Sequence, residues 1–244
     1  MCSRHFVAGL PSLKAAAKKN VVCYVTNRKS LVRAAAEAKA PKILENIRVA
    51  LNAGVDWIQI REKDLPAREL LALARQAAQT ADARDGKNPS ARIIVNDRLD
   101  VAVVAGAHGV HLGQASIVAS DVVRWCRAGN APADFAIGLS CHSLEEARSA
   151  ENAKVNYIFF GPIFETPSKK EFGDPQGIQK LAEVCLAVPS VEVIAIGGVN
   201  AENAVSCICA GAAGIAAIRM FQESRDVNVA RETVASIHDL DAKE

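Results

Sequence analysis

The chain has 244 residues, half of them hydrophobic, and its 29 basic and 27 acidic side chains leave a formal net charge of +2. This length suits one large domain or two small ones with a substantial core. The near-neutral charge excludes a general attraction to nucleic acid or to an anionic membrane, and no segment is apolar for long enough to span a membrane. Any cationic site must therefore be local.

Seven cysteines are scattered along the chain without a Cys-x-x-Cys pair. This pattern predicts a reducing compartment and argues against a zinc site. Residues 1–20 lack the apolar core of a secretory signal, so we expect a cytoplasmic protein with an N-terminal extension of this length. The basic residues of this extension also resemble an organelle transit peptide, but the strand-like run from Val21 disfavours that interpretation.

From residue 21 onward, short β-rich runs alternate with segments of helical periodicity. The predicted strands are 21–26, 57–63, 92–95, 109–112, 135–139, 157–160, 191–196 and 214–218. The predicted helices are 41–52, 66–83, 99–105, 121–127, one that starts near 144, one that ends near 186, 200–210 and 227–240. Ala-Gly pairs at 53–54, 105–106 and 210–211 are expected to end helices, because glycine tolerates the left-handed cap.

Eight strands alternating with eight helices, without a linker, predict one parallel α/β domain over residues 21–244. The strands are mostly apolar on both faces, as in buried parallel sheets. No dinucleotide-binding fingerprint follows the first strand, so the pattern favours a closed (β/α)₈ TIM barrel over a doubly wound sheet. Reactive residues of such barrels lie at the carboxyl ends of the strands.

Those strand ends are polar in this chain. In 57–63, strand alternation would point Gln59, Arg61 and Lys63 to one face, where they could hold a phosphate or diphosphate. The alternation alone is more typical of a solvated antiparallel strand. The other strand ends carry Asn96, Asp97, Ser140, His142, Gly197, Gly198 and Arg219.

Several of these residues suggest a specific role. Asp97 is a candidate ligand of Mg²⁺, which takes one or two carboxylates together with phosphate oxygens. The glycine pair Gly197-Gly198 would let backbone N–H groups approach a phosphate, although a tight turn also needs glycine. Thr166 and Ser168 could add hydroxyl donors for the same anion. His142 is either a proton shuttle or a helix-entry residue.

His108 and His111 flank Gly109 without a third metal ligand at suitable spacing, and we interpret both histidines as structural.

Taken together, these motifs resemble the thiamine phosphate synthase family over almost the whole chain from Val21. The matching segments are Gln59-Ile-Arg61-Glu-Lys63, Val95-Asn96-Asp97, Gly109-Val-His-Leu-Gly-Gln114, Gly138-Leu-Ser140-Cys-His142, Gly161-Pro-Ile-Phe164 with Thr166 and Lys169, and Ile196-Gly-Gly-Val199. Several motifs in the same order along the chain argue against a chance match.

The resemblance implies a transferase that joins an aminopyrimidine methyl diphosphate to a thiazole phosphate and releases pyrophosphate. It implies that Gln59, Arg61, Lys63, Asn96 and Lys169 bind the diphosphate and that Asp97 binds Mg²⁺. It also implies that Ser140 lies beside the pyrimidine and the leaving group, and that Thr166, Ser168 and Gly198 bind the thiazole phosphate. The expected partners are small phosphorylated molecules, neither nucleic acid nor membrane, and a homo-oligomer stays open.

Three positions depart from the family pattern. Ser116 stands where a second Mg²⁺ carboxylate is usual, which should weaken metal binding. Arg219 replaces a common serine and would either clamp or crowd the phosphate. Asn27 stands where an aspartate commonly follows the first strand.

Other functions stay open at this point. Ser116 is also typical of the related thiazole tautomerases, in which His142 would move a proton without metal or diphosphate. The strand-end residues Gln59, Arg61 and Lys63 favour the synthase over the tautomerase. An inactive regulatory paralogue is a third interpretation. A different phosphate-binding barrel enzyme would be expected to carry a strand-borne lysine or an Asp or Cys base instead.

Overall fold

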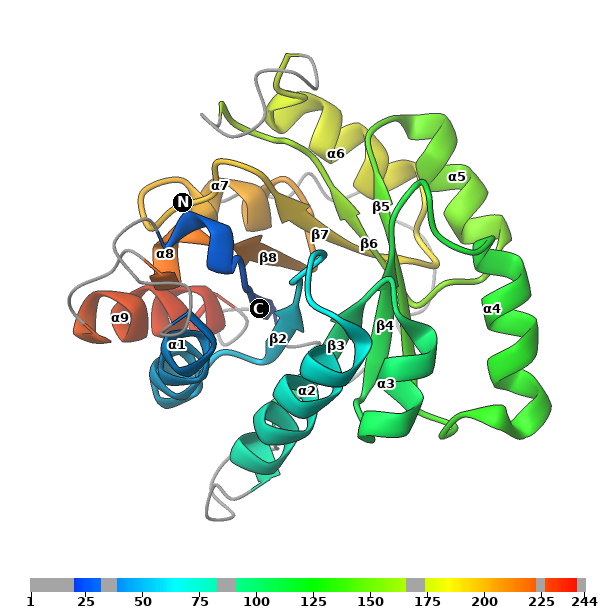
Figure 1. Cartoon of the computed structure of the whole chain (residues 1–244). Helices are drawn as coiled ribbons and strands as arrows, with labels where there is room; N and C mark the ends of the chain where they lie inside the picture. Colours follow the sequence, from blue (N-terminus) through cyan, green and yellow to red (C-terminus); the bar gives the residue numbers. More distant parts are fainter. Residues whose placement is uncertain (1–19, 32–38, 83–90, 166–173, 223–226, 241–244) are drawn as a thin grey trace.

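The computed structural model describes residues 20–31, 39–82, 91–165, 174–222 and 227–240, through which strands and helices alternate (Figure 1). The strands are β1 (Val21–Val25), β2 (Trp57–Ile60), β3 (Arg92–Asn96), β4 (Gly109–Leu112), β5 (Ala136–Cys141), β6 (Tyr157–Phe160), β7 (Glu192–Ile196) and β8 (Gly214–Ala217). The helices are α1 (Lys39–Ala53), α2 (Ala67–Asp82), α3 (Leu99–Ala105), α4 (Ala119–Trp125), α5 (Leu144–Asn152), α6 (Gly177–Ala187), α7 (Ala204–Cys209), α8 (Arg219–Gln222) and α9 (Val227–His238). A 3₁₀ turn, η1 (Arg28–Ser30), follows β1, and a π-helical turn, η3 (Cys126–Asn130), extends α4.

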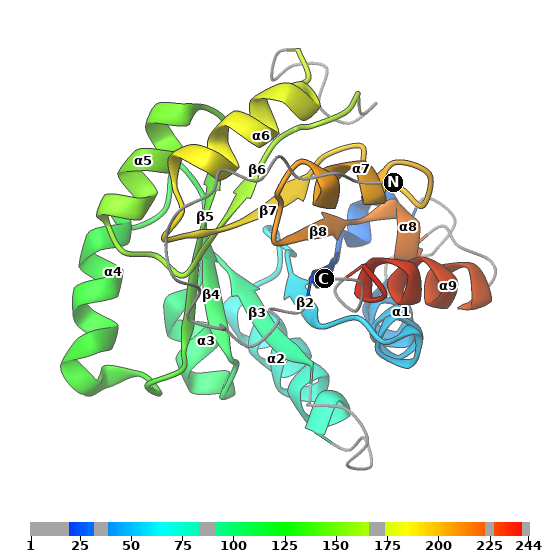
Figure 2. The ribbon, with the colours of Figure 1, turned by 180° about the vertical axis from the view of Figure 1, so that it is seen from behind.

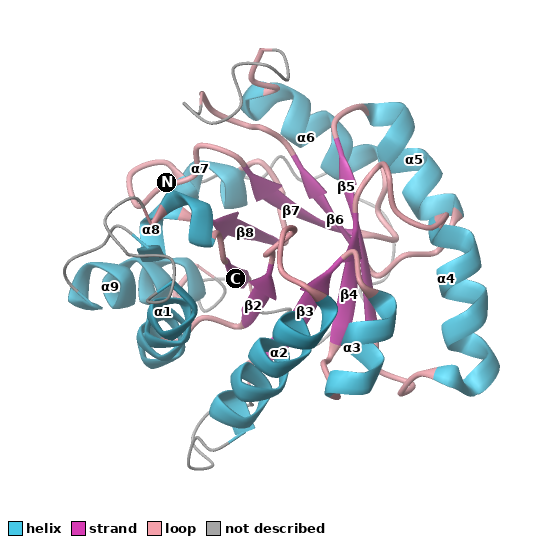
Figure 3. Cartoon of the chain, viewed as in Figure 1, coloured by secondary structure: helices cyan, strands magenta, loops and turns pink. Residues whose placement is uncertain are grey.

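All eight strands are parallel and close into one barrel in the order β1 to β8. Closure is made by β8, which pairs with β1 so that Val21 lies opposite Gly214. Helices surround the strands in Figure 3, and Figure 2 shows the same arrangement from behind. The predicted (β/α)₈ barrel is therefore confirmed. Because the strands are parallel, their carboxyl ends meet at one mouth.

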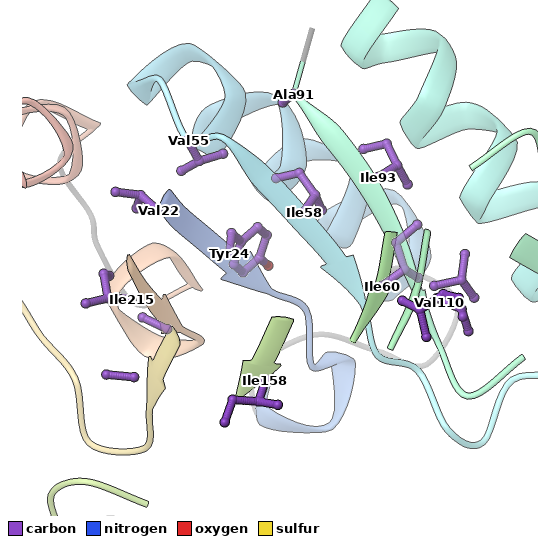
Figure 4. Packing of buried hydrophobic residues seen from close by; sticks show 14 of the residues in the cluster. Val22, Tyr24, Val55, Ile58, Ile60, Ala91, Ile93, Val110, Ile158 and Ile215 are labelled. Carbon is purple, nitrogen blue, oxygen red and sulfur yellow. The ribbon is translucent and has the colours of Figure 1, made fainter. Parts of the chain in front are cut away.

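Two apolar layers explain why the strands are hydrophobic on both faces. Alternate residues of the strands, such as Ile58, Ile93 and Ile215, belong to the large cluster between barrel and helices (Figure 4). Their sequence neighbours pack inside the barrel, in a smaller cluster that contains Cys23, Val25, Trp57, Ile94, Ala136, Tyr157, Phe159, Ile194 and Ala216. Removing these side chains from water is the main driving force for the fold.

Two boundaries differ from the expectation and move residues of interest. Strand β2 ends at Ile60, so only Gln59 of the three polar residues lies in the strand. Arg61 and Lys63 belong to the following turn, in which the Leu65 N–H donates to the Glu62 carbonyl at 3.1 Å. Helix α8, which the sequence did not predict, begins at Arg219, so this residue follows strand eight rather than ending it.

The ends of the described chain bear on the predicted domain limits. Residues 1–19 of the predicted extension lie outside the described residues, so its boundary stays a prediction. The side-chain amide of Asn20 donates to the Ile237 carbonyl at 3.2 Å, which ties the start of β1 to α9. In the described part of the chain, no helix has both the length and the hydropathy needed to cross a membrane.

Candidate active site

The mouth begins with an amide pair on neighbouring strands. Gln59 on β2 is buried, and its Nε2 donates to Oδ1 of Asn96 at the end of β3 at 3.2 Å. Strand alternation places both side chains inside the barrel rather than against the helices. Each amide therefore holds the other in place at the barrel mouth.

A half-buried cation follows the amide pair. Arg61 is held by its backbone N–H, which donates to the Thr26 hydroxyl at 3.0 Å, and burial lowers the pKa of its guanidinium. Lys63, two residues later, is exposed in the turn. A partly desolvated guanidinium and an exposed ammonium two residues away in sequence suit a polyanionic ligand.

Glu62, between these two cations, was missed by the sequence analysis. The residue is 4% exposed, and its carboxylate accepts hydrogen bonds from the backbone N–H of Arg28 at 3.0 and 3.1 Å. The side chain of Arg28 makes an ion pair, with its guanidinium 2.9 Å from the Asp64 carboxylate. Burial raises the pKa of Glu62. The carboxylate thus joins the loop after β1 to the loop that carries Arg61.

Asp97 and Ser116 face each other across the ends of β3 and β4. Asp97 has a positive φ of 66°, and its exposed carboxylate accepts a hydrogen bond from the Ser116 hydroxyl. That hydroxyl in turn accepts one from the Gly113 N–H at 2.7 Å. Within the described ranges, no group of three or more His, Cys, Asp or Glu residues could hold a metal ion. A cation bound here would need oxygen ligands from substrate or water in addition to Asp97.

Ser140 lies at the end of β5 and contacts a histidine that we interpreted as structural. Its hydroxyl is 2.9 Å from Nε2 of His111, a residue of β4 that is 1% exposed. The other ring nitrogen, Nδ1, is 3.1 Å from the Tyr157 hydroxyl on β6. His111 is therefore hydrogen-bonded to a candidate site residue, a contact that the sequence did not predict.

His142 is held by the start of α5. Its Nδ1 donates to the Gly161 carbonyl, and its backbone N–H donates to the Glu146 carboxylate at 2.6 Å. Ser143 caps this helix, because its hydroxyl accepts from the Glu146 N–H at 3.1 Å. The Glu146 side chain, however, bonds to the neighbouring N–H and to Gln114 instead of closing a reciprocal capping box.

The glycine pair after β7 packs against the loop that follows β6. Gly198 has a φ of +70°, and a β-carbon there would lie 2.7 Å from Cβ of Phe164 and 2.8 Å from the Glu165 carbonyl oxygen. The Phe164 N–H donates to the Gly197 carbonyl at 2.9 Å. Glycine is thus needed for both conformation and space. The predicted residues Thr166, Ser168 and Lys169, which follow Glu165, lie outside the described residues.

The remaining predicted residues lie at the rim. Arg219 is exposed at the start of α8. Asn27 caps η1, with its Oδ1 accepting from the Lys29 N–H at 3.2 Å. The helix predicted over 200–210 begins only at Ala204, and Asn200 accepts the N–H groups of Glu202 and Asn203 in the turn before it.

These features define a (β/α)₈-barrel enzyme with cationic and amide side chains around its mouth. Sequence comparison makes the assignment specific: the model of the thiamine monophosphate synthase family matches residues 24–221, and the chain belongs to this family.

Individual relatives agree with the family match. A putative thiamine-phosphate synthase of Geobacter sulfurreducens is 40% identical, covering 75% of this chain and 80% of the relative. A thiamine-phosphate synthase of Roseiflexus sp. is 37% identical over 89% of this chain and 84% of its own. Among solved structures, the thiamine phosphate pyrophosphorylase of Pyrococcus furiosus superposes with a TM-score of 0.74 at 29% identity, covering 93% of this chain and 99% of that one.

Proposed function

We propose that this chain is a thiamine phosphate synthase, a transferase that couples an aminopyrimidine methyl diphosphate with a thiazole phosphate. The observation that carries the proposal is the meeting of Gln59, Asn96, Arg61 and Asp97 at one barrel mouth in a member of this family. Two amides, a half-buried guanidinium and a carboxylate form a set of groups suited to a diphosphate and its counter-cation.

Two groups of residues would hold the two substrates. For the diphosphate, the proposed residues are Gln59, Arg61, Lys63, Asn96, Ser140 and Lys169. For the thiazole phosphate, they are Thr166, Ser168 and the backbone N–H of Gly198, with Arg219 at the rim as a further cation. The packing of Gly198 against Phe164 supports this division, because it brings the β7 loop beside the segment that leads into Thr166.

The coupling requires one bond to break and one to form. The bond between the methylene carbon and the diphosphate oxygen breaks, and its electron pair leaves with the diphosphate. The thiazole nitrogen then donates its lone pair to the cationic carbon, so that a C–N bond forms and no net oxidation occurs. The negative charge that grows on the leaving diphosphate would be stabilised by Arg61, Lys63 and Lys169. Such stabilisation by preorganised groups is usually the largest single contribution to catalysis.

Mg²⁺ is part of the proposal. Asp97 supplies one carboxylate and Ser116 one hydroxyl oxygen, a sparse but suitable set for an ion that keeps several waters and binds substrate phosphates. When bound, the ion neutralises negative charge on the diphosphate. Asp97 would hold it at the strand ends, and Ser116 would orient the carboxylate.

A second candidate is a thiazole tautomerase, and one observation favours it. Nδ1 of His142 must carry a proton because it donates to the Gly161 carbonyl, so Nε2 of a neutral ring is left as a base. This nitrogen could move a proton between ring positions of a thiazole carboxylate phosphate. The synthase is preferred because Gln59, Arg61 and Lys63 have no task in such a reaction.

One assay separates the two candidates. The protein is incubated with both thiamine precursors, with and without Mg²⁺, and separately with the thiazole tautomer. Formation of thiamine phosphate and pyrophosphate in equal amounts is expected, and His142→Ala should leave this coupling largely intact. Turnover of the tautomer without coupling would overturn the proposal, and consumption of neither would favour a regulatory paralogue.

Two further expectations belong to the proposal. A cytoplasmic location is expected because the cysteines are scattered along the chain without a Cys-x-x-Cys pair. Small phosphorylated molecules are the expected partners, and assembly into a homo-oligomer stays open.

A further inference from the structure

Three polar side chains form a line through the interior of the barrel. The hydroxyl of Tyr157 on β6 is 3.1 Å from Nδ1 of His111 on β4, and Nε2 of His111 is 2.9 Å from the Ser140 hydroxyl on β5. Tyr157 is fully buried, and His111 is 1% exposed. Only the Ser140 end of the line reaches the mouth.

Packing fixes the positions of the two rings. The imidazole lies against Phe159, with ring centroids 4.3 Å apart, and the tyrosine ring meets Trp57 edge-on at 4.7 Å. Gly138 leaves the space for this tyrosine, because a β-carbon there would lie 2.1 Å from the ring carbon that carries the hydroxyl. The line is therefore held in place by the apolar residues around it.

Burial also determines the protonation states of His111 and Tyr157. It lowers the pKa of His111 to about 3, with the nearby Arg61 charge acting in the same direction. Burial raises the pKa of Tyr157 well above its ordinary value. At neutral pH the imidazole is therefore uncharged and the phenol protonated, so that one ring nitrogen donates and the other accepts.

The direction of the two hydrogen bonds follows from the buried phenol. A buried hydroxyl proton that meets no acceptor is costly, and among the residues that the structure describes, Nδ1 of His111 lies within hydrogen-bond reach of the Tyr157 hydroxyl. Tyr157 donating to Nδ1 leaves the ring proton on Nε2. The Nε2–H group then donates to the Ser140 oxygen, so that the proton of Ser140 is directed elsewhere.

We propose that His111 is a positioning residue that orients the Ser140 hydroxyl as a hydrogen-bond donor toward the anion at the mouth, and that Tyr157 fixes the required imidazole tautomer. This inference deepens the proposed synthase function and rests on it for the identity of the anion, a diphosphate. A neutral histidine suits this place because it directs the serine without adding a buried charge.

The tautomer can be measured without any turnover. In the intact protein labelled with ¹⁵N-histidine, the His111 signals are assigned by their loss in His111→Gln. We expect a protonated, pyrrole-type Nε2 and an unprotonated, pyridine-type Nδ1 at pH 7. The reverse pattern, or a doubly protonated ring, would overturn the proposed direction whether or not the protein makes thiamine phosphate.

A double-mutant cycle tests whether His111 acts through Ser140. Asparagine at 111 retains a polar group near the Nδ1 position but not at Nε2, so His111→Asn should lower kcat on the order of ten- to a hundredfold, like Ser140→Ala. The two effects should not multiply in the double variant. Glutamine can reach the Nε2 position, so His111→Gln should recover much of the loss. Multiplicative effects, or no rescue by glutamine, would contradict a positioning role.

His108 offers a matched control for the replacement of a barrel histidine by asparagine. Its Nδ1 accepts from the Ile93 N–H at 3.0 Å, at the opposite end of strands β3 and β4. His108→Asn should leave kcat unchanged. Calorimetric titration with inorganic pyrophosphate gives a second measurement: His111→Asn should weaken binding, and His108→Asn should not. An equal loss of binding in both variants would indicate a general structural effect and reject the proposal.

Discussion

The Ser116 hydroxyl donates a hydrogen bond to the Asp97 carboxylate across the ends of two neighbouring strands. The resemblance to the family implies a second Mg²⁺ carboxylate at position 116, and the contact indicates that an acidic side chain there would face Asp97. In this protein one negative charge and one hydroxyl occupy that place. The metal affinity should therefore respond to the charge of residue 116.

We predict that Ser116→Asp binds Mg²⁺ more tightly than the native protein by at least about tenfold, about 1.4 kcal/mol, because a second carboxylate is added. Without metal, the two carboxylates should repel each other and lower the melting temperature. Calorimetric titration measures the affinity, and Ser116→Ala is the matched control that should not tighten it. An unchanged titration curve for the aspartate variant would show that residue 116 does not face the ion.

Replacing Arg61 by alanine should lower pyrophosphate release by a factor of about 10² to 10³, the usual loss when one preorganised donor is removed. Arg68 on α2 is exposed, and Arg68→Ala is the control for loss of a positive charge alone. Lys169→Ala should behave like Arg61→Ala, although this residue lies outside the described part of the chain. Turnover like that of the native protein in Arg61→Ala would remove the guanidinium from the diphosphate site.

Gly198→Ala should raise the KM for the thiazole phosphate, because the new methyl group meets Phe164 and Glu165 at less than 3 Å. Gly106, which caps α3, has the same φ of +70° but no atom within 4 Å of the added β-carbon. Both variants should lose about 1 to 2 kcal/mol of stability from left-handed backbone strain. Only Gly198→Ala should change the KM, and equal KM values in the two variants would argue against the proposed phosphate position.

Acid should destabilise this protein partly through His111. Its pKa is lowered to about 3 in the folded state, while the unfolded chain takes up the proton near the ordinary value of 6.5. Between these values the unfolded state binds more protons, so the free energy of unfolding falls as the pH is lowered, by at most about 1.4 kcal/mol per pH unit for this group. Urea unfolding from pH 7 to 4 should be less pH-dependent for His111→Gln, and identical slopes would contradict a buried neutral histidine.

The fold was predictable because each buried parallel strand is a short apolar run between helical segments. The ends of strands were less visible: the alternation of β2 continues through Arg61 and Lys63, whereas the strand stops at Ile60. The chain leaves the strand direction at Arg61, whose N–H donates to the Thr26 hydroxyl, a partner 35 residues distant in sequence. Local periodicity contains no information about such a contact.

The position of candidate residues at the barrel mouth was predictable where family motifs mark strand ends, as at Asn96 and Ser140. His111 was missed because its partners are 29 and 46 residues away and become neighbours only in the closed barrel. The burial of Glu62 could have been predicted from the sequence. This residue continues the alternation of Ile58 and Ile60, which predicts that its carboxylate turns toward the buried face. A buried carboxylate needs hydrogen-bond donors, and the Arg28 N–H donates to both of its oxygens.

A crystal structure with thiamine phosphate, pyrophosphate and Mg²⁺ bound together would test the central claim most directly. The account predicts that the pyrophosphate contacts Gln59, Arg61 and Asn96, that Mg²⁺ contacts Asp97, and that the ester phosphate lies at Gly198. All three ligands would then share the one barrel mouth. Ligands bound on separate surfaces, or a pyrophosphate that touches none of these side chains, would contradict it.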